Sequence, residues 1–588
     1  MLSIGTKNRD LKEKNYMIMS MIGFFVIGIL KMIPAGLIGF NWIGLLSGRK
    51  DNEYFWLVQV VRVFATAIII FAYIELMLID LTFASLFNNF AWLIAIIVIV
   101  DSIISTVEAE STGISLLGGF IGLILALVWI YMVFIQPMTI KQELYAQVEI
   151  TEKKDMQEIK DLESMILVSG SLADQKGDAV ASKVTNANYF NEGSYKVSKY
   201  NGELLHSAPL EFDSFMKVRK AHETPGFTIV PALDPSGSAK LVEQDMVYLD
   251  SNYFDKDLYR HVRKEYPDKI IFGQYFQPVN EKESYFVFQV GSYMNYRTGH
   301  KQEGIITVHP KTGEMDYYDL DEVPEWVSRV YSVDTAMNLW SIWGKNKNGW
   351  WNQSTFGSKT DVVVPNADTL QISINNDGDI IYVTDFVKQR DLGSTTNIIG
   401  YGEFNARTGK MTYYTNNDAI LTGQEAINKI NASEALKLKG SVTFANYYRI
   451  YGAPTYVSPV MDTSNKFVGV AVMYGDSNNP IVVFGKNKED AFRNYKREIA
   501  SVGKGNSNTP SATVELEKVS GIITKVNDAN YPQGYVFLLK LEGNEKIFSV
   551  NPEIYPEVVL LEKGEKVNLE VLDMEEKIIP AEVFSIIE

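Results

Sequence analysis

The chain has 588 residues, no cysteine, five histidines and a formal net charge of −16. The lack of cysteine excludes disulfides, thiolate metal sites and a thiol nucleophile, and the few histidines narrow metal and acid–base chemistry. Nearly all of the negative charge follows residue 147, and an acidic surface repels phosphate backbones, so we expect no nucleic-acid partner. The length predicts several domains.

Residues 1–147 predict an α-helical membrane domain with four or five spans. A basic tail precedes an apolar stretch, Tyr16 to Leu46, that is long for one span of ~20 residues. The stretch is either one tilted helix kinked near Pro34 or two short segments that meet at Lys31. The further spans are expected at about 63–87, 90–107 and 114–135. Because apolar segments follow at once, we expect a retained anchor rather than a cleaved signal peptide.

The number of spans decides the side of the membrane on which the rest of the chain lies. Four spans with the basic tail inside leave the body in the cytoplasm. If Tyr16–Leu46 is a hairpin, Arg49 and Lys50 also fall inside and the body is exported. We favour the second arrangement, since it places the two richest basic clusters on one side.

Four charged residues lie within or beside the apolar spans: Arg62, Glu75, Asp80 and Asp101. Charges in hydrocarbon cost several kcal/mol, so they commonly face a bundle interior, a pore or an opposite charge. Three of them lie near expected span ends, which leaves Glu75 alone deep in the membrane. We favour packing and assembly over an ion or proton pathway. Small residues at Gly113–Gly122 favour close helix contacts, which could also join chains into a homo-oligomer.

The segment 148–200 is expected to be a charged linker, with a helical stalk at Glu149–Glu163. Residues 201–502 then contain four glycine-led hairpins, and each is followed by a helical pattern. The hairpins begin at Gly226, Gly304, Gly402 and Gly469, and the helices are expected at about 255–266, 324–343, 423–436 and 488–500. This internal repeat predicts four α+β modules, each an antiparallel hairpin plus a helix with one buried sheet face.

A flexible linker is expected at 503–512, where Gly, Asn, Ser and Pro gather. Residues 513–588 show about five strands, which predicts a small β-barrel of the OB-fold or SH3-like kind. Carboxylates outnumber lysines there, so we expect an interaction or packing module rather than a nucleic-acid binder.

Tryptophans cluster in the second module. Trp340 and Trp343 are three residues apart, as a buried helix face requires, and we expect them in the core. The residues that follow Gly349 are expected in a loop, where stacking aromatics suit the binding of a polymer or a protein partner. The candidate partner-binding residues are Trp350, Trp351, Asn352 and Phe356.

The search for catalytic or metal-binding residues gives nothing specific. His300 and His309, with Glu303 or Glu314, imitate a metal cluster, but their spacing matches no zinc motif. The sequence has no phosphate-binding glycine loop, nucleophile elbow or HExxH motif. We therefore expect no enzyme activity, no cofactor and no metal.

Several segments resemble a family of uncharacterised multi-pass membrane proteins of bacteria and phages, some loosely labelled cell-shape proteins. They are GELLHSAPLEFDSFMK, ETPGFTIVPALDPSG, GIITVHPKTGEMDYYDLDEVPEWVSRVY and DAFRNYKREI. The hairpin-plus-helix unit is also similar to PepSY-type modules. The resemblance covers about residues 200–500, excludes the barrel, and implies a cell-membrane protein with a mostly extracytoplasmic body of unknown activity.

These features predict a membrane-anchored binding or scaffolding protein whose partners are the bilayer and a cell-envelope protein or polymer. One alternative is an accessory or pore-forming subunit of a transport complex. Another is a regulatory or inhibitory PepSY-like module that acts on a cell-envelope enzyme.

Overall fold

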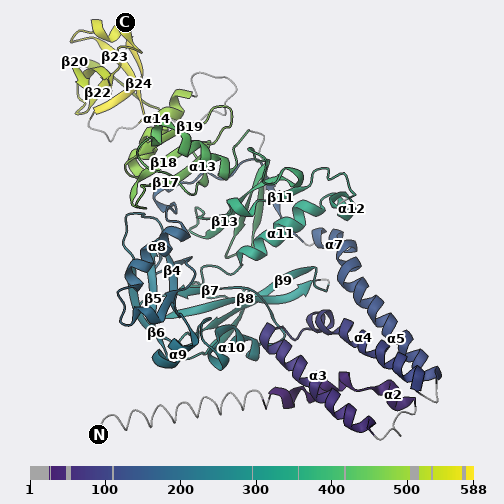
Figure 1. Cartoon of the computed structure of the whole chain (residues 1–588). Helices are drawn as coiled ribbons and strands as arrows, with labels where there is room; N and C mark the ends of the chain where they lie inside the picture. The colour runs from purple at the N-terminus through teal and green to yellow at the C-terminus, as the bar shows by residue number, and fades with distance from the viewer. Residues whose placement is uncertain are drawn as a thin grey trace, which may run out of the picture.

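A computed structural model gives the architecture of the chain (Figure 1). It describes residues 26, 28–47, 54–108, 112–146, 148–294, 296–354, 356–415, 419–502, 516–531, 534–572 and 578–587. The helical N-terminal region and a small C-terminal barrel lie at opposite ends of a body made of several β-sheets (Figure 1). The basic tail, Arg49 and Lys50, and the expected linker at 503–512 lie outside the described residues.

Three helices within the described residues are long and apolar enough to cross a membrane. They are α3 (Phe55–Met77), α4 (Phe83–Glu108) and the continuous stretch Thr112–Thr139, which comprises α5 (Thr112–Ile130), the π-helical turn η3 (Tyr131–Ile135) and α6 (Gln136–Thr139). A shorter apolar helix spans Gly28–Gly39 and ends in η1 (Leu37–Gly39), and α2 (Trp42–Leu46) follows. The number of crossings before residue 47 remains a prediction, because most of 1–27 is not described.

The first long span begins and ends earlier than its hydropathy predicts. The expected range 63–87 crosses the turn between α3 and α4, where Leu78 adopts a φ of 49° and ends α3. Apolar residues continue through that turn, so hydropathy alone does not mark it. As a result Arg62 lies inside α3 rather than at its start, and Glu75 lies near the C-terminal end rather than deep in the span.

The body contains four main sheets. The first has β2 (Phe190–Glu192), β3 (Lys196–Tyr200), β4 (Glu203–Phe212), β5 (Thr224–Pro231) and β6 (Lys240–Met246). The second has β7 (Ile270–Pro278), β8 (Ser284–Met294), β9 (Gly299–Val308) and β10 (Met315–Asp319). The third has β1 (Thr151–Lys153), β11 (Val363–Pro365), β12 (Gln371–Ile374), β13 (Ile380–Lys388), β14 (Gly400–Asn405) and β15 (Met411–Thr415). The fourth has β16 (Asn446–Ile450), β17 (Ala453–Met461), β18 (Phe467–Tyr474) and β19 (Ile481–Gly485).

Each predicted glycine-led hairpin is present as an antiparallel strand pair, and a close backbone approach explains the leading glycine. A Cβ atom at Gly226, Gly304 or Gly469 would collide with a carbonyl oxygen of the partner strand. In the third hairpin the residue with this clash is Gly400, which pairs with Thr415 as Gly304 pairs with Asp319. The predicted start at Gly402 is therefore two residues late. Whether the four units are repeats of one ancestral module remains a prediction.

Helices follow the hairpins, as predicted, but the second begins later than expected. The helices are α10 (Leu258–Glu265), α11 (Val333–Asn346), α13 (Gly423–Ala432) and α14 (Lys488–Val502). Residues 324–331 cross to the third sheet instead of starting α11, and the amides of Val330 and Tyr331 donate to the carbonyl of Ala406. Ser332 then caps α11, with its hydroxyl accepting from the amide of Thr335.

The central strands are buried on both faces, not on one. Along β13 every residue from Ile380 to Val387 is buried. Alternate residues face α11 on one side, where Trp340 lies, and α13 with the fourth sheet on the other, where Tyr456 lies. The sheets therefore pack in pairs, since a shared core joins the first to the second and another joins the third to the fourth.

Residues 148–200 do not form the expected helical stalk. β1 adds a parallel strand to the edge of the third sheet, beside β15, and α8 (Gly170–Ala181) packs on the first sheet. Met165 and Leu167 are buried in the core of the fourth sheet. The charged residues suggested a solvated stalk, but the apolar residues that follow them anchor this segment to the body.

Five strands at the C-terminal end close into a barrel. They are β20 (Glu517–Tyr531), β21 (Gly534–Leu541), β22 (Ile547–Val550), β23 (Lys566–Val571) and β24 (Ile578–Ile587). The ammonium of Lys496 on α14 donates to the carbonyl of Leu572 at 2.7 Å, which ties the barrel to the fourth sheet's helix.

Candidate functional site

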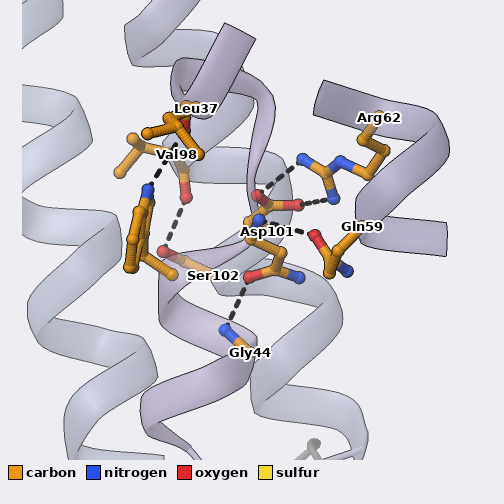
Figure 2. Close-up of polar contacts among 9 residues, drawn as sticks. Leu37, Gly44, Gln59, Arg62, Val98, Asp101 and Ser102 are labelled. Carbon is orange, nitrogen blue, oxygen red and sulfur yellow. Dashed lines mark hydrogen bonds and ion pairs between the residues drawn. The ribbon is translucent and has the colours of Figure 1, made fainter. Parts of the chain in front are cut away.

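The predicted intramembrane charges Arg62 and Asp101 form one bidentate ion pair. Both terminal guanidinium nitrogens of Arg62, on α3, donate to the two carboxylate oxygens of Asp101, on α4, at 2.8 Å (Figure 2). The Asp101 side chain is 5% exposed and that of Arg62 is 29% exposed. Two parallel bonds fix both helices in rotation and height, so the pair acts as a joint between α3 and α4.

Neutral polar groups complete the same region (Figure 2). The backbone amide of Asn41 donates to the Gln59 side-chain oxygen at 2.8 Å, and both residues are buried. The Asn41 side chain accepts from the amide of Gly44 and caps α2. Ser102 donates to the carbonyl of Val98 within α4. These contacts satisfy polar groups internally, as a low-dielectric environment requires.

Glu75 contacts the body rather than the membrane interior. Its carboxylate accepts from the guanidinium of Arg260, on α10, and forms an ion pair with it. Next to it, the amide of Leu81 donates to the carbonyl of Pro267 at 2.7 Å. The end of α3 is therefore tied to the helix of the first module.

Asp80 belongs to a second junction with the body. Its carboxylate accepts from the amide and hydroxyl of Thr82 and, at 3.3 Å, from the hydroxyl of Tyr293 on β8. Tyr293 also contacts Ser85 at 3.4 Å, and the guanidinium of Arg297 donates to the Ser85 hydroxyl. The guanidinium of Arg297 lies 4.8 Å from the Tyr293 ring centroid.

The sequence singles out all four membrane charges but not their partners in the body. Arg260 lies 185 residues from Glu75, and no local spacing marks so distant a contact. Arg260 and Arg297 are ordinary surface-type cations in the sequence, and only the fold brings them to the turn between α3 and α4.

The predicted aromatic surface lies on a short helix instead of a loop. Residues Gly349–Gln353 form α12, which packs beside α7 (Lys141–Ala146) at the end of the third span (Figure 1). Trp351 is 58% exposed and Phe356 is 84% exposed, and their rings stack with centroids 6.5 Å apart. The side-chain amide of Asn352 donates to the carbonyl of Thr360 at 2.8 Å, so it holds the segment after α12 in place rather than facing a partner. The side chain of Trp350 lies outside the described residues.

Two buried titratable groups of the first module have shifted pKa values. Burial raises the pKa of Glu211 to about 7, against the opposing effect of hydrogen bonds from Ser251. Burial also lowers the pKa of His206 to about 4, against the effect of its hydrogen bond to the carbonyl of Val168. His206 is thus neutral at pH 7, whereas Glu211 is mostly neutral only below about pH 7, and each side chain bonds a neighbouring backbone or hydroxyl group.

No cluster of three or more His, Asp or Glu side chains suited to a metal ion occurs among the described residues. His300 stacks on Phe272, and His309 accepts hydrogen bonds from the amides of Lys311 and Thr312. The two histidines that imitate a metal cluster in the sequence therefore have different neighbours in the structure. Comparison of the chain with protein-family models and with curated protein sequences gives no match.

Proposed function

We propose that this chain is a membrane-anchored scaffolding or binding protein that presents a body of β-sheet modules at a fixed orientation on one face of a bilayer. The observation that carries the proposal is the pairing of the membrane charges. Arg62 and Asp101 bind each other, and Glu75 and Asp80 bind the body. A charge held in a bidentate pair is poorly suited to bind and release a moving ion.

The two junctions at the turn between α3 and α4 support a rigid connection. Glu75 meets α10, and Asp80 and Ser85 meet the hairpin of β8 and β9. A third connection comes from α7, where the Leu144 side chain is buried beneath the body. Three contact points that do not lie on one helix restrict rotation as well as translation, which a presenting scaffold requires.

We propose that the body is exported from the cytoplasm of a bacterial or phage-infected cell. In the sequence Arg49 and Lys50 precede α3, and it is the C-terminal end of α3 that touches the body. If these basic residues are cytoplasmic, as the positive-inside rule favours, one crossing by α3 puts the body on the other side of the membrane. The short apolar helix runs antiparallel to α3, since Gly28 lies against Phe71 and Gly39 against Thr66. A basic tail on the body's side would instead favour a cytoplasmic body, and cysteine labelling on intact cells separates the two arrangements.

The transport alternative needs several copies to form a pore through the small-residue face. Gly118 and Gly122 are already packed within one chain, against Ile43, Ser102 and Ile99. This use of the face inside the chain favours the scaffold over the pore-forming subunit. The PepSY-like regulatory reading and the OB-fold or SH3-like nature of the barrel are further proposals that rest on resemblance and strand pattern alone.

The rigid connection is testable by distance measurement between two spin labels. Labels at Val107→Cys, on α4, and Lys301→Cys, on β9, suit a chain without native cysteine. In lipid nanodiscs we expect one narrow distance distribution for the parent, and a broader one with Glu75→Gln. Glu265→Gln, an exposed carboxylate on the same helix as Arg260, is the matched control and should leave the distribution narrow. A broad distribution in the parent would refute the proposal.

A further inference from the structure

The end of the third span continues directly into the body's aromatic surface. Along the span, Phe134 and Met138 are 56% and 50% exposed, as lipid-facing residues are. α7 begins at Lys141, two residues after the span, and packs on α11 and α12. The buried side chains of Leu144, on α7, and Ile342, on α11, both lie against Gly299, at 3.2 and 3.9 Å from the position that a Cβ atom would occupy there. α12 is therefore held beside the end of the third apolar helix.

Two rings project from this site. Trp351, on α12, and Phe356, just after it, are exposed and stack on each other, whereas Trp340 and Trp343 of α11 are buried. The two rings together form a small exposed apolar surface. Amphipathic rings at the edge of a membrane span favour the headgroup region, where the apolar body of the ring leaves water.

We propose that Trp351 and Phe356 insert into the lipid headgroup layer beside the third span and hold the body against the bilayer. The surface would thus take lipid as its occupant rather than an envelope polymer. The nearby charges are mixed, since Lys345 and Lys359 occur with Glu143 and Asp361 on the same segments. Insertion therefore depends on the aromatic rings and is insensitive to lipid charge. This inference does not depend on the scaffold proposal, because a transport subunit could dock in the same way.

The first test measures the depth of a probe on the full-length chain in nanodiscs. Phe356→Cys carries an environment-sensitive fluorophore, and Leu438→Cys, a fully exposed apolar position in the third module, is the control. Lipids with a nitroxide near the headgroup should quench the probe at 356 at least about twofold more than the probe at 438. The result should be the same in phosphatidylcholine alone and with added phosphatidylglycerol.

A second test uses the native tryptophans as probes, so that Phe356 stays in place. Brominated lipids quench tryptophans that touch the bilayer, so Trp351→Tyr should reduce the quenchable fraction of the fluorescence. Trp326→Tyr is the control, since Trp326 stacks on Tyr285 within the second module, and it should leave that fraction unchanged. Equal quenching at 356 and 438, together with no effect of Trp351→Tyr, would overturn the inference. Protection of the probe at 356 that arises only on addition of cell-wall polymer would also overturn it, in favour of a polymer site.

Discussion

The ion pair between Arg62 and Asp101 allows a quantitative test of how the membrane helices are held together. Arg62→Met leaves the Asp101 carboxylate, which is 5% exposed, without its guanidinium. Removing one partner of a buried pair typically costs about 3–5 kcal/mol, because the other charge stays desolvated. Asp101→Leu leaves Arg62, whose side chain is 29% exposed and can reach toward the interface. Its cost should be smaller, about 2–3 kcal/mol.

The double variant removes both charges together. Replacing a whole buried pair with apolar residues is commonly close to neutral, so we expect it within about 1 kcal/mol of the parent. The coupling energy of the cycle should then be at least about 4 kcal/mol, well above the ~0.6 kcal/mol that neutral interhelical hydrogen bonds average in membranes. This difference decides between a structural joint and an incidental contact.

Steric trapping measures these free energies in bicelles, with tags at Tyr54→Cys and Val107→Cys, which lie at the ends of α3 and α4 away from the body. Ser102→Ala is the control partner for Arg62→Met. Its hydroxyl bonds the carbonyl of Val98 on its own helix, so the coupling should be near zero. A coupling energy between Arg62 and Asp101 below about 1 kcal/mol would refute the reasoning, since it would not exceed that of an ordinary hydrogen bond.

Three further predictions concern the body. Burial raises the pKa of Glu211 from 4.5 to about 7, so the stabilisation that this group contributes is complete below about pH 4.5 and is lost as the pH rises through 7. The melting temperature of Glu211→Gln relative to the parent should therefore increase from about pH 5 to about pH 8. A difference that stays constant with pH would contradict the shift. Gly304→Ala drives a Cβ into the carbonyl of Tyr318 and should cost about 1–3 kcal/mol, whereas Gly170→Ala, which meets no atom, should stay within about 0.5 kcal/mol in chemical denaturation. Trp340→Ala should destabilise the fully buried core by about 3–5 kcal/mol and Trp351→Ala by less than about 1 kcal/mol, and equal effects would contradict the burial assignment.

Patterns with a local physical cause predict this fold well. The glycine-led hairpins follow from close backbone approach, and the spacing of Trp340 and Trp343 follows from helix periodicity; both are local properties. The five strands of the barrel likewise show in the alternation of residues after 513. The shift of the third hairpin from Gly402 to Gly400 could have been found from the TG turn, since Gly409 stands as far from Gly400 as Gly313 does from Gly304.

Patterns that depend on distant contacts were not predictable. The charged run at 149–163 looks solvated, yet β1 pairs with β15 more than 250 residues later. The depth of Glu75 depends on where α3 ends, and that end is set by the backbone at Leu78 rather than by hydropathy. Its partner Arg260 is too distant in the sequence for a local pattern to predict the contact.

Flux across proteoliposomes tests the scaffold account most directly. The purified full-length chain is reconstituted beside protein-free vesicles, and proton and potassium movement is followed under an imposed membrane potential. Because Glu75 and Asp101 are held in ion pairs, we expect the flux to match that of protein-free vesicles. A flux well above that background, lost with Glu75→Gln or Asp101→Asn and retained with Glu265→Gln, would contradict the scaffold account and establish the membrane charges as a pathway.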